Sequence, residues 1–295
     1  MELAVIILNY NTKDLLESCL KSVLSKKWQT QLKVIVVDNA SSDDSRNALK
    51  KFPQVKVIEN DKNLGFAAGN NVALRSTAAD YYLLLNSDTL VQDDSLDALV
   101  GFAEEKDFDI VSCKLLNSDK TFQPNAGELP FGLPLFFWIS GLDDIPFIGK
   151  LLPSFHQKYE DNLLRSEEVG WVSGTAMLIK KKVIDQIGLL DEVLFMYAED
   201  TEYCFRAKKK GFKIGWTNKG QIIHLGGGSL KDPSFRQWLG EFRGLIYIYK
   251  KYLGSLASLF LKLVFLIFIF IRVVVYLVIG KVKIAATYTK ILYQL

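Results

Sequence analysis

The sequence predicts an α/β fold in which a mainly parallel central sheet has helices on both faces and is followed by an apolar helical segment. Short apolar runs rich in β-branched and aromatic residues, such as 34–37 and 81–85, alternate with amphipathic stretches through the first hundred residues. This alternation is typical of strands buried on both faces of a parallel sheet. With 295 residues, of which 49% are hydrophobic, the chain can bury a sizeable core.

The elements can be assigned in order along the chain. We expect strands at 4–8, from 32 onward, at 55–59, 81–85 and 110–115, and helices at 12–25, from 41 onward, at 66–76 and 94–105. From 117 to 168 the pattern lapses and five prolines interrupt it, which is typical of a lid, a binding segment or a run of short elements. Within it, the apolar patch 133–139 is suited to contact an acceptor lipid or to be buried beneath the domain.

Polar residues follow three of the expected strands. Asp38 and Asp88 stand at or just beyond the ends of two apolar runs, and Asn9-Tyr10-Asn11 follows the first strand. Ligands of open α/β sheets bind beyond the carboxyl ends of the strands, where the strand order reverses. We therefore expect these residues to meet in one cleft, in which two carboxylates suit a metal and a nucleotide.

Composition excludes some classes of protein. The formal net charge is only +3, and the lysine runs 180–182 and 208–210 lack interleaved aromatic residues, so nucleic acid is not an expected partner. Cys19, Cys113 and Cys204 are an odd number without ligand spacing, which favours reduced thiols in a cytosolic domain. No cleavable signal precedes the first strand, so we expect the catalytic part to lie on the cytoplasmic side of the cell membrane.

The second half holds the remaining candidate residues. Glu199-Asp200 opens a helix expected at 201–210, where an acidic pair also has a purely structural explanation in the helix dipole. His224 follows a short apolar run, and a lone histidine is often structural. Asn86-Ser87-Asp88 is equally compatible with an Asx-type turn that ends a strand. None of these signals is specific by itself.

As an ordered set, these motifs are specific. The chain resembles the inverting family 2 glycosyltransferases of the GT-A fold, in particular the rhamnosyltransferase-like members, over roughly residues 3–250. The residues that carry the resemblance are 6–11, 36–43, 63–71, 85–89, 171–174, 197–200 and 224–229. The resemblance implies a Rossmann-like GT-A fold, with a mixed central sheet and helices on both faces.

The resemblance also implies roles at the nucleotide end of the site. Asp38 would accept a hydrogen bond from the ring N–H of a pyrimidine, with Asn9 and Asn11 beside the base and ribose. The segment that contains Gly65 and Asn70 would let backbone N–H groups approach the nucleotide. The alternative for that segment is a helix of small residues packed closely on the sheet.

At the reacting end, Asn86-Ser87-Asp88 departs from the Asp-x-Asp form at its first position, so only Asp88 is expected to ligate a metal directly. With His224 it would hold Mn²⁺ or Mg²⁺ against the donor diphosphate. Asp200 would be the general base that deprotonates the acceptor hydroxyl. Glu199 would lie near the donor sugar or orient the acceptor, and Trp171 suits a sugar wall.

The C-terminal region predicts membrane association. Residues 256–279 are dominated by Leu, Ile, Val and Phe, but Lys262 and Arg272 interrupt them on one narrow helical sector. Such a helix crosses the bilayer, lies in its plane or re-enters it, and the alternative is an apolar oligomerisation helix. We expect a catalytic domain at 1–253 and a membrane-associated helical segment at 254–295.

The expected function is transfer of one sugar, L-rhamnose from dTDP-L-rhamnose, to a lipid-linked or cell-surface glycan in polysaccharide or cell-wall biosynthesis. The alternative within the family is a UDP-sugar donor of galactose, glucose or N-acetylglucosamine. An alternative of another class is a non-catalytic, membrane-anchored nucleotide-sugar scaffold, against which the presence of Asp88, Asp200 and His224 together argues. The sequence leaves open the acceptor linkage and whether the chain forms a homo-oligomer.

Overall fold

The computed structural model describes residues 1–226 and 233–295. Its main feature is a nine-stranded sheet with the order β3-β2-β1-β4-β10-β6-β11-β5, in which β7 also pairs with β6. A two-stranded ribbon joins β8 to β9. The strands are β1 Glu2–Asn9, β2 Gln31–Asp38, β3 Lys56–Glu59, β4 Tyr81–Asn86, β5 Thr89–Val91, β6 Ile110–Leu116, β7 Phe122–Gln123, β8 Ala126–Gly127, β9 Trp171–Val172, β10 Ala176–Lys180 and β11 Ile214–His224.

The sheet is mixed, because β10, β5 and β7 run antiparallel to their neighbours. β3, β2, β1 and β4 are parallel, whereas β10 lies antiparallel between β4 and β6. β11 is parallel to β6 and antiparallel to β5, and its register with β5 pairs His224 with Thr89. The carboxyl ends of β1 and β4 therefore lie at the same edge as the end of β11.

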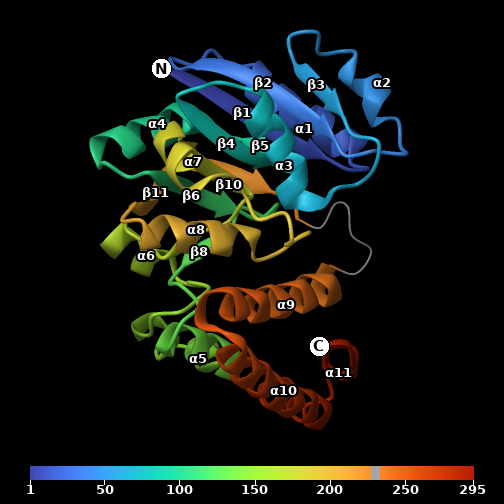
Figure 1. Cartoon of the computed structure of the whole chain (residues 1–295), viewed down its shortest axis with the longest axis vertical. Helices are drawn as coiled ribbons and strands as arrows, with labels where there is room; N and C mark the ends of the chain where they lie inside the picture. Colours follow the sequence, from blue (N-terminus) through green and yellow to red (C-terminus); the bar gives the residue numbers. More distant parts are fainter. Residues whose placement is uncertain (227–232) are drawn as a thin grey trace.

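Helices cover both faces of the sheet (Figure 1). Successive residues of β1 point to opposite faces, so Leu3 and Val5 join one core and Ala4 joins the other. α1 and α4 pack in the first core, and α3, α7 and α8 in the second. The helices of the domain are α1 Lys13–Leu24, α2 Ser45–Leu49, α3 Gly65–Ser76, α4 Ser95–Glu105, α5 Leu133–Ser140, α6 Glu160–Ser166, α7 Lys181–Ile187 and α8 Glu199–Lys209.

Most elements expected from the sequence are present at those positions, but α2 begins later than expected. The residues from 41 to 43 are tied to the end of β1, because Asn11 Oδ1 accepts hydrogen bonds from the backbone N–H groups of Ser42 and Asp43. α2 therefore starts at Ser45 instead of Ser41. The strand β10 was not expected from the sequence, and neither was α9.

The irregular segment 117–168 consists of short elements: β7, β8, α5, α6 and the 3₁₀ turns η1 Leu142–Asp144 and η2 Gly149–Leu151. The patch 133–139 forms most of α5, and its two faces differ. Leu135 and Ile139 are buried, whereas Leu133 and Phe136 are 63% and 45% exposed. The segment is therefore partly buried beneath the domain and partly open on its other side.

Three helices complete the chain: α9 Pro233–Leu253, α10 Ser255–Val278 and α11 Val282–Gln294. Gly254, whose φ of +92° suits glycine, separates α9 from α10 at the expected boundary between 253 and 254. The division into two domains at this point stays a prediction. By length and composition, α10 is the one helix in the described ranges that could cross a membrane.

Candidate active site

A cavity of about 470 Å³ opens at the carboxyl ends of β1, β4 and β11. It brings together candidates from distant parts of the chain, namely Gly65, Asp88, Trp171, Glu199, Asp200 and His224. Four other candidates lie outside its lining: Asn9, Asn11, Asp38 and Asn70. The last part of the motif at 224–229, Gly227-Gly228-Ser229, lies outside the described residues.

Asp88 and His224 meet because β5 pairs with the end of β11. The backbone N–H of Leu225 donates to the Asp88 carbonyl at 2.9 Å, and His224 Nε2 lies 3.2 Å from Asp88 Oδ1. On the other side of the ring, His224 Nδ1 lies 2.7 Å from Gln123 Oε1. Since an amide oxygen only accepts, this contact assigns a proton to Nδ1 and directs Nε2 at Asp88.

The chemistry of this pair fits a divalent cation. Adjacent ligands in an octahedron with bonds of about 2.1 Å are about 3 Å apart, close to the observed oxygen–nitrogen separation. Among the residues that the structure describes, no cluster of three or more His, Cys, Asp or Glu side chains is placed to hold a metal. A two-ligand site of this kind is typical of ions that also bind substrate phosphates and water.

Asp200 is held at the start of α8 by two backbone amides. Its Oδ2 accepts the Gly174 N–H at 2.9 Å, and its Oδ1 accepts the Thr201 N–H at 2.7 Å. Burial raises the pKa of the Asp200 carboxyl above the usual value, although these two hydrogen bonds oppose the shift. A fixed carboxylate with a raised pKa, facing a cavity, has the properties of a general base.

Its neighbour Glu199 is 4% exposed, and its Oε2 has no hydrogen-bond partner within the described part of the chain. Burial, with the charge of Asp200, raises the pKa of Glu199 well above its ordinary value. A buried carboxyl with a raised pKa is neutral over a wider pH range and can donate a hydrogen bond. Glu199 is therefore suited to bind a hydroxyl oxygen.

The turn before Glu199 is strained. Tyr197 and Ala198 have φ values of +73° and +67°, a region that costs non-glycine residues roughly 1–3 kcal/mol each. α9 supports this turn closely through two glycines. A Cβ on Gly244 would come 2.4 Å from the Ala198 Cβ, and one on Gly240 would come 2.5 Å from the Tyr197 ring.

Among the residues of the site that were not expected from the sequence are His156 and Glu241. His156, from the irregular segment, contacts Glu241 of α9 through a short hydrogen bond, and both line the cavity. The charge of Glu241 raises the pKa of Asp200, and that of His156 lowers it. The spacing Gly240-x-x-x-Gly244 is the signal that could have identified a helix in close contact with the site.

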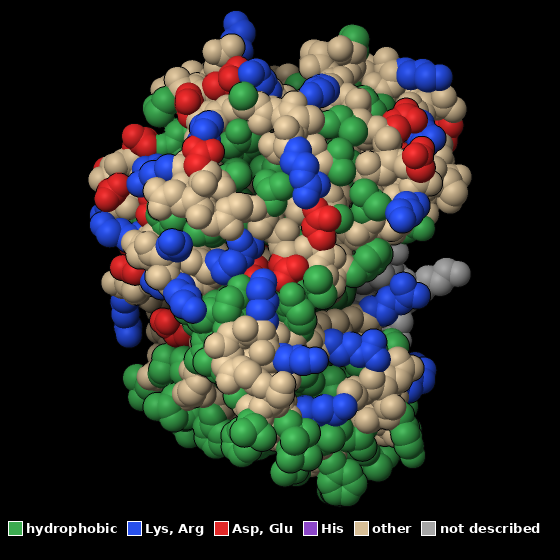
Figure 2. All heavy atoms as spheres, in the orientation of Figure 1, with side chains coloured by type: hydrophobic (Ala, Val, Ile, Leu, Met, Phe, Trp, Pro, Cys, Tyr) green, Lys and Arg blue, Asp and Glu red, His purple; other side chains and the backbone are tan. Residues whose placement is uncertain are grey.

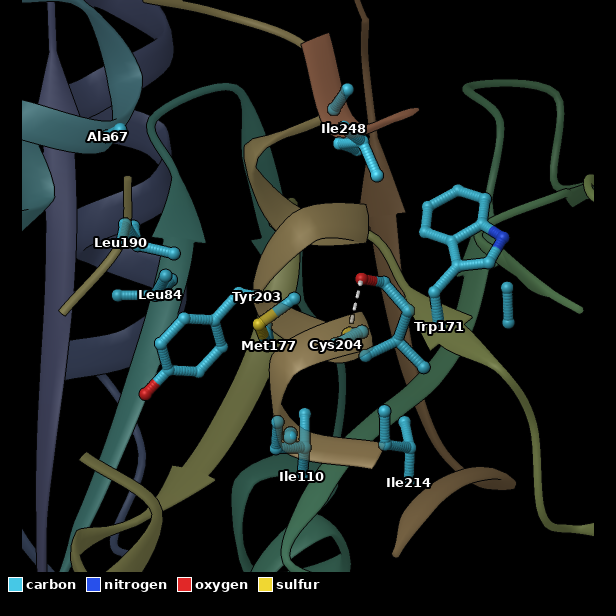
Figure 3. Packing of buried hydrophobic residues seen from close by; sticks show 14 of the residues in the cluster. Ala67, Leu84, Ile110, Trp171, Met177, Leu190, Tyr203, Cys204, Ile214 and Ile248 are labelled. Atoms are coloured by element: carbon cyan, nitrogen blue, oxygen red, sulfur yellow. Dashed lines mark hydrogen bonds between the residues drawn. The ribbon is translucent and has the colours of Figure 1, made fainter. Parts of the chain in front are cut away.

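Trp171 belongs to the β8–β9 ribbon and is almost fully buried. Its indole N–H donates to the Phe155 carbonyl at 2.6 Å, so only the ring remains for a sugar. Next to it, α8 packs onto the sheet through Tyr203 and Cys204, and the Cys204 thiol donates to the Val172 carbonyl (Figure 3). The wall of the cavity at Trp171 is thus supported from behind by the core.

At the nucleotide end, Asp38 is fully buried, and its carboxylate has hydrogen-bond donors within the protein. Its carboxylate accepts hydrogen bonds from the Asn9 side chain, the Ser41 N–H and Arg46 Nε, at 3.0, 3.1 and 2.9 Å. Burial favours a higher pKa for Asp38, but the hydrogen bonds outweigh it and lower the pKa below the usual value. The Arg46 side chain is 42% exposed, so it has room to leave Asp38.

Gly65 and Asn70 lie in α3, with different surroundings. Gly65 has a φ of +83°, and a Cβ there would come 2.3 Å from the Phe195 carbonyl oxygen. Asn70 is buried and donates to the Phe66 carbonyl. The close approach in this segment is therefore to the protein's own backbone, although Gly65 also lines the cavity.

The comparisons with known proteins identify the family. The model of the family described as Glycosyl transferase family 2 matches residues 4–188, which is more than half of the chain. The chain therefore belongs to glycosyl transferase family 2, and it is a glycosyltransferase.

Two relatives illustrate the range of activities. The low-salt glycan biosynthesis hexosyltransferase Agl10 of Haloferax volcanii is 28% identical over 227 residues, which cover 76% of this chain and 67% of the relative. The N-acetylglucosaminyl-diphospho-decaprenol L-rhamnosyltransferase of Mycobacterium tuberculosis is 24% identical over 239 residues, which cover 75% of each protein.

Solved structures share the fold. The mannosyltransferase PcManGT from Pyrobaculum calidifontis, in complex with GDP-Man and Mn²⁺, has a TM-score of 0.59 at 16% identity, covering 97% of this chain and 73% of that one. S. aureus TarS has a TM-score of 0.56 at 18% identity, and the match covers 86% of this chain but only 40% of TarS. These similarities confirm the expected GT-A fold with its mixed sheet.

Proposed function

We propose that the protein is an inverting, divalent-metal-dependent glycosyltransferase that moves one sugar from a pyrimidine nucleotide to a glycan on a lipid carrier. One observation carries the proposal. Asp200, fixed by two backbone amides and with a raised pKa, faces the same cavity as the Asp88–His224 pair. The cavity thus holds a base for the acceptor together with ligands for the cation that serves the donor.

In this mechanism, Asp88 and His224 would hold the cation, and the chemistry that a bound cation would supply is neutralisation of charge on the nucleoside diphosphate. Asp200 takes the proton of an acceptor hydroxyl while that oxygen forms a bond to the anomeric carbon. The bond from that carbon to the diphosphate oxygen breaks on the opposite face, so the configuration inverts. A positioned base typically contributes ~10²–10⁴ in rate.

Two neighbours orient the sugars. Glu199, in its neutral form, donates a hydrogen bond to a hydroxyl oxygen, since its Oε2 lacks a partner among the described residues. The Trp171 ring forms an apolar wall, as aromatic faces do in sugar sites. Both residues therefore act on position and selectivity more than on proton transfer.

For the nucleobase, Asp38 accepts the ring N–H of uracil or thymine once Arg46 has moved away from its Oδ2. Asn9 keeps its hydrogen bond to Oδ1 and fixes the carboxylate. Asn11, Gly65 and Asn70 then serve mainly to hold the loops around the nucleotide. The buried carboxylate, with one exposed and displaceable partner, supports this role.

The donor and acceptor are drawn from the relatives. A relative named as an N-acetylglucosaminyl-diphospho-decaprenol L-rhamnosyltransferase supports L-rhamnose as the sugar and a lipid-linked acceptor. A pyrimidine carrier such as dTDP follows from the role proposed for Asp38. The name of Agl10 supports transfer of a hexose as the alternative. Mn²⁺ in the PcManGT complex supports Mn²⁺ or Mg²⁺ as cofactor.

Three buried cysteines without disulfides support a cytoplasmic catalytic domain.

The test measures release of nucleoside diphosphate by purified protein across dTDP-L-rhamnose, UDP-hexoses and GDP-mannose, with and without a short diphospholipid acceptor. Turnover that needs the acceptor, Mn²⁺ and Asp200, and that prefers a pyrimidine donor, is the expected result. Donor binding without turnover in every combination would instead support a non-catalytic scaffold. A clear preference for GDP-mannose would overturn the role of Asp38.

A further inference from the structure

One end of the molecule carries an apolar surface built by two separate parts of the chain. We define this apolar face as the exposed large apolar side chains of residues 133–151 and 256–279. Its most exposed members are Phe147 and Leu151 in the first segment and Leu256 and Val278 in the second, all at least 80% exposed. Figure 2 shows hydrophobic side chains gathered at the end of the molecule where Figure 1 places α5 and α10.

The opposite side of α10 is packed against the protein along most of its length. Its buried residues, Ser258, Leu261, Phe265 and Ile269, recur at helical spacing and form one stripe. The Ser258 hydroxyl donates to the Ile246 carbonyl of α9. α10 is therefore a helix with one protein-facing side and one free apolar side.

Arg272 connects the two parts of the apolar face by hydrogen bonds. Its guanidinium donates to the carbonyl oxygens of Trp138 and Ile139 at the end of α5, and to the Tyr288 hydroxyl of α11, each at 3.0 Å. The charge that interrupts the apolar run of α10 thus has protein partners. A helix that lies flat at an interface tolerates such a residue on its protein side.

The packing of α9 against α10 argues that α10 does not cross the bilayer. α9 runs beside it, as the 4.8 Å separation of the Phe242 and Phe265 rings shows. α9 also carries Gln237 and Glu241, which line the cavity. A spanning α10 would carry this polar cavity wall to the depth of the hydrocarbon, where unsatisfied polar groups are costly.

The charge of the C-terminal segment 254–295 complements an anionic surface. Besides Arg272, which is bound by the protein, residues 254–295 contain four lysines, Lys262, Lys281, Lys283 and Lys290, and no Asp or Glu. Figure 2 shows Lys and Arg side chains beside the hydrophobic end of the molecule. Basic groups next to an inserted apolar face are attracted to the headgroups of anionic lipids.

From these observations we infer that α10 does not span the membrane but lies in its plane, and that the apolar face of α5–η2 and α10 inserts as one unit into a single anionic leaflet. The inference deepens the membrane association proposed above. It makes the α5–η2 segment, which also leads to His156 in the cavity wall, a part of the membrane contact. A lipid-linked acceptor would then enter from the leaflet beside α9.

The first test measures binding of full-length protein to vesicles of phosphatidylcholine with and without phosphatidylglycerol. A Leu133→Glu/Phe136→Glu/Phe147→Glu variant changes only exposed side chains, and Val57→Glu on the distant strand β3 is the matched control. We expect the triple variant to bind at least about tenfold more weakly, with the control unchanged and anionic lipid favoured. Equal binding of triple variant and wild type would overturn the inference, because a spanning α10 needs no help from α5–η2.

A second test is independent of binding strength. Single Leu256→Cys and Val278→Cys variants carry a fluorophore at either end of α10, and the buried native cysteines Cys19, Cys113 and Cys204 should react slowly. We expect both labels to lie at the same shallow depth and to be quenched by dithionite from the same side of reconstituted vesicles. Protection of one label only would establish a spanning helix. Neither test uses activity, so the enzymatic proposal can fail or succeed separately.

Discussion

His224 Nε2 lies 3.2 Å from Asp88 Oδ1, while its Nδ1 lies 2.7 Å from Gln123 Oε1. Gln123 belongs to β7 and is itself held by a hydrogen bond from its amide to Asn117 Oδ1 at 2.7 Å. The irregular segment therefore orients the imidazole that faces the candidate metal position. Groups that hold a ligand's second nitrogen fix its orientation, and their loss typically lowers metal affinity about 10–100-fold.

Replacing Gln123 by leucine should raise the Mn²⁺ concentration needed for half-maximal turnover by about 10–100-fold, because the ring loses its fixed orientation. Asp88→Ala and His224→Ala should weaken donor binding only when metal is present. Titration of turnover with Mn²⁺, and of donor binding with and without EDTA, measures both effects. Undiminished sugar transfer in the presence of EDTA would show that Gln123, Asp88 and His224 do not serve a metal site.

Asp200→Asn should lower kcat by ~10²–10⁴ and leave donor affinity largely unchanged, since the amide cannot accept the acceptor proton. Single-turnover kinetics with donor binding measured in parallel separates these quantities. A variant that retains more than about a tenth of wild-type turnover would exclude Asp200 as the base.

The pH dependence of kcat/KM should show an acid limb that lies above the usual Asp value of 3.8, because burial raises the pKa of Asp200. The base must be ionised, so activity should rise with pH through this limb. Glu241→Gln should move the limb to lower pH and His156→Gln to higher pH, since their charges act in opposite directions. A shift of the acid limb in the same direction in both variants would contradict the assignment of this limb to Asp200.

Asp38 should stabilise the fold in a pH-dependent way. Its pKa in the folded protein is lowered, so its contribution is present above the unfolded value near 3.8 and is lost as the pH falls through the folded value. Asp38→Asn should therefore cost about 1–3 kcal/mol at pH 7 and less at pH 3, which lies below the unfolded value. Urea unfolding at both pH values measures the difference, and a constant difference would disprove the linkage.

Gly244→Ala should disturb the strained turn at Tyr197 and Ala198, because the new methyl group meets the Ala198 side chain. We expect a loss of about 1–3 kcal/mol in unfolding free energy, and a larger fall in activity than stability explains. Gly101→Ala is the control, since nothing lies within 4 Å of a Cβ at this exposed position in α4. It should stabilise the helix by about 0.5–1 kcal/mol.

Local patterns account for what could be predicted. β1 and β4 are recognisable because both their faces are buried, and the start of α8 because its acidic pair precedes helical spacing. β10 is five residues long, and nothing in its sequence indicates that it lies antiparallel between two distant strands. The meeting of Asp88 with His224 depends on the register of β5 with β11, which is likewise non-local.

The site residues missed by the sequence have the same explanation. Glu241 reaches the cavity only because two glycines allow α9 to approach the turn before α8. His156 is held among aromatic rings, at 5.0 Å from that of Trp171, in a segment without periodic pattern. Their partners are fixed by packing, which a single sequence does not reveal.

The hydrogen bonds of Arg272 also bear on the order in which the chain is synthesised. α5 is translated well before α10, yet the side chain that donates to carbonyl oxygens near the end of α5 belongs to α10. The core beneath α5 likewise includes Phe265 and Ile291. While the chain is still emerging from the ribosome, the sheet can form ahead of this layer. The wall of the cavity at His156 is then completed by Glu241 of α9, which is translated after every strand of the sheet.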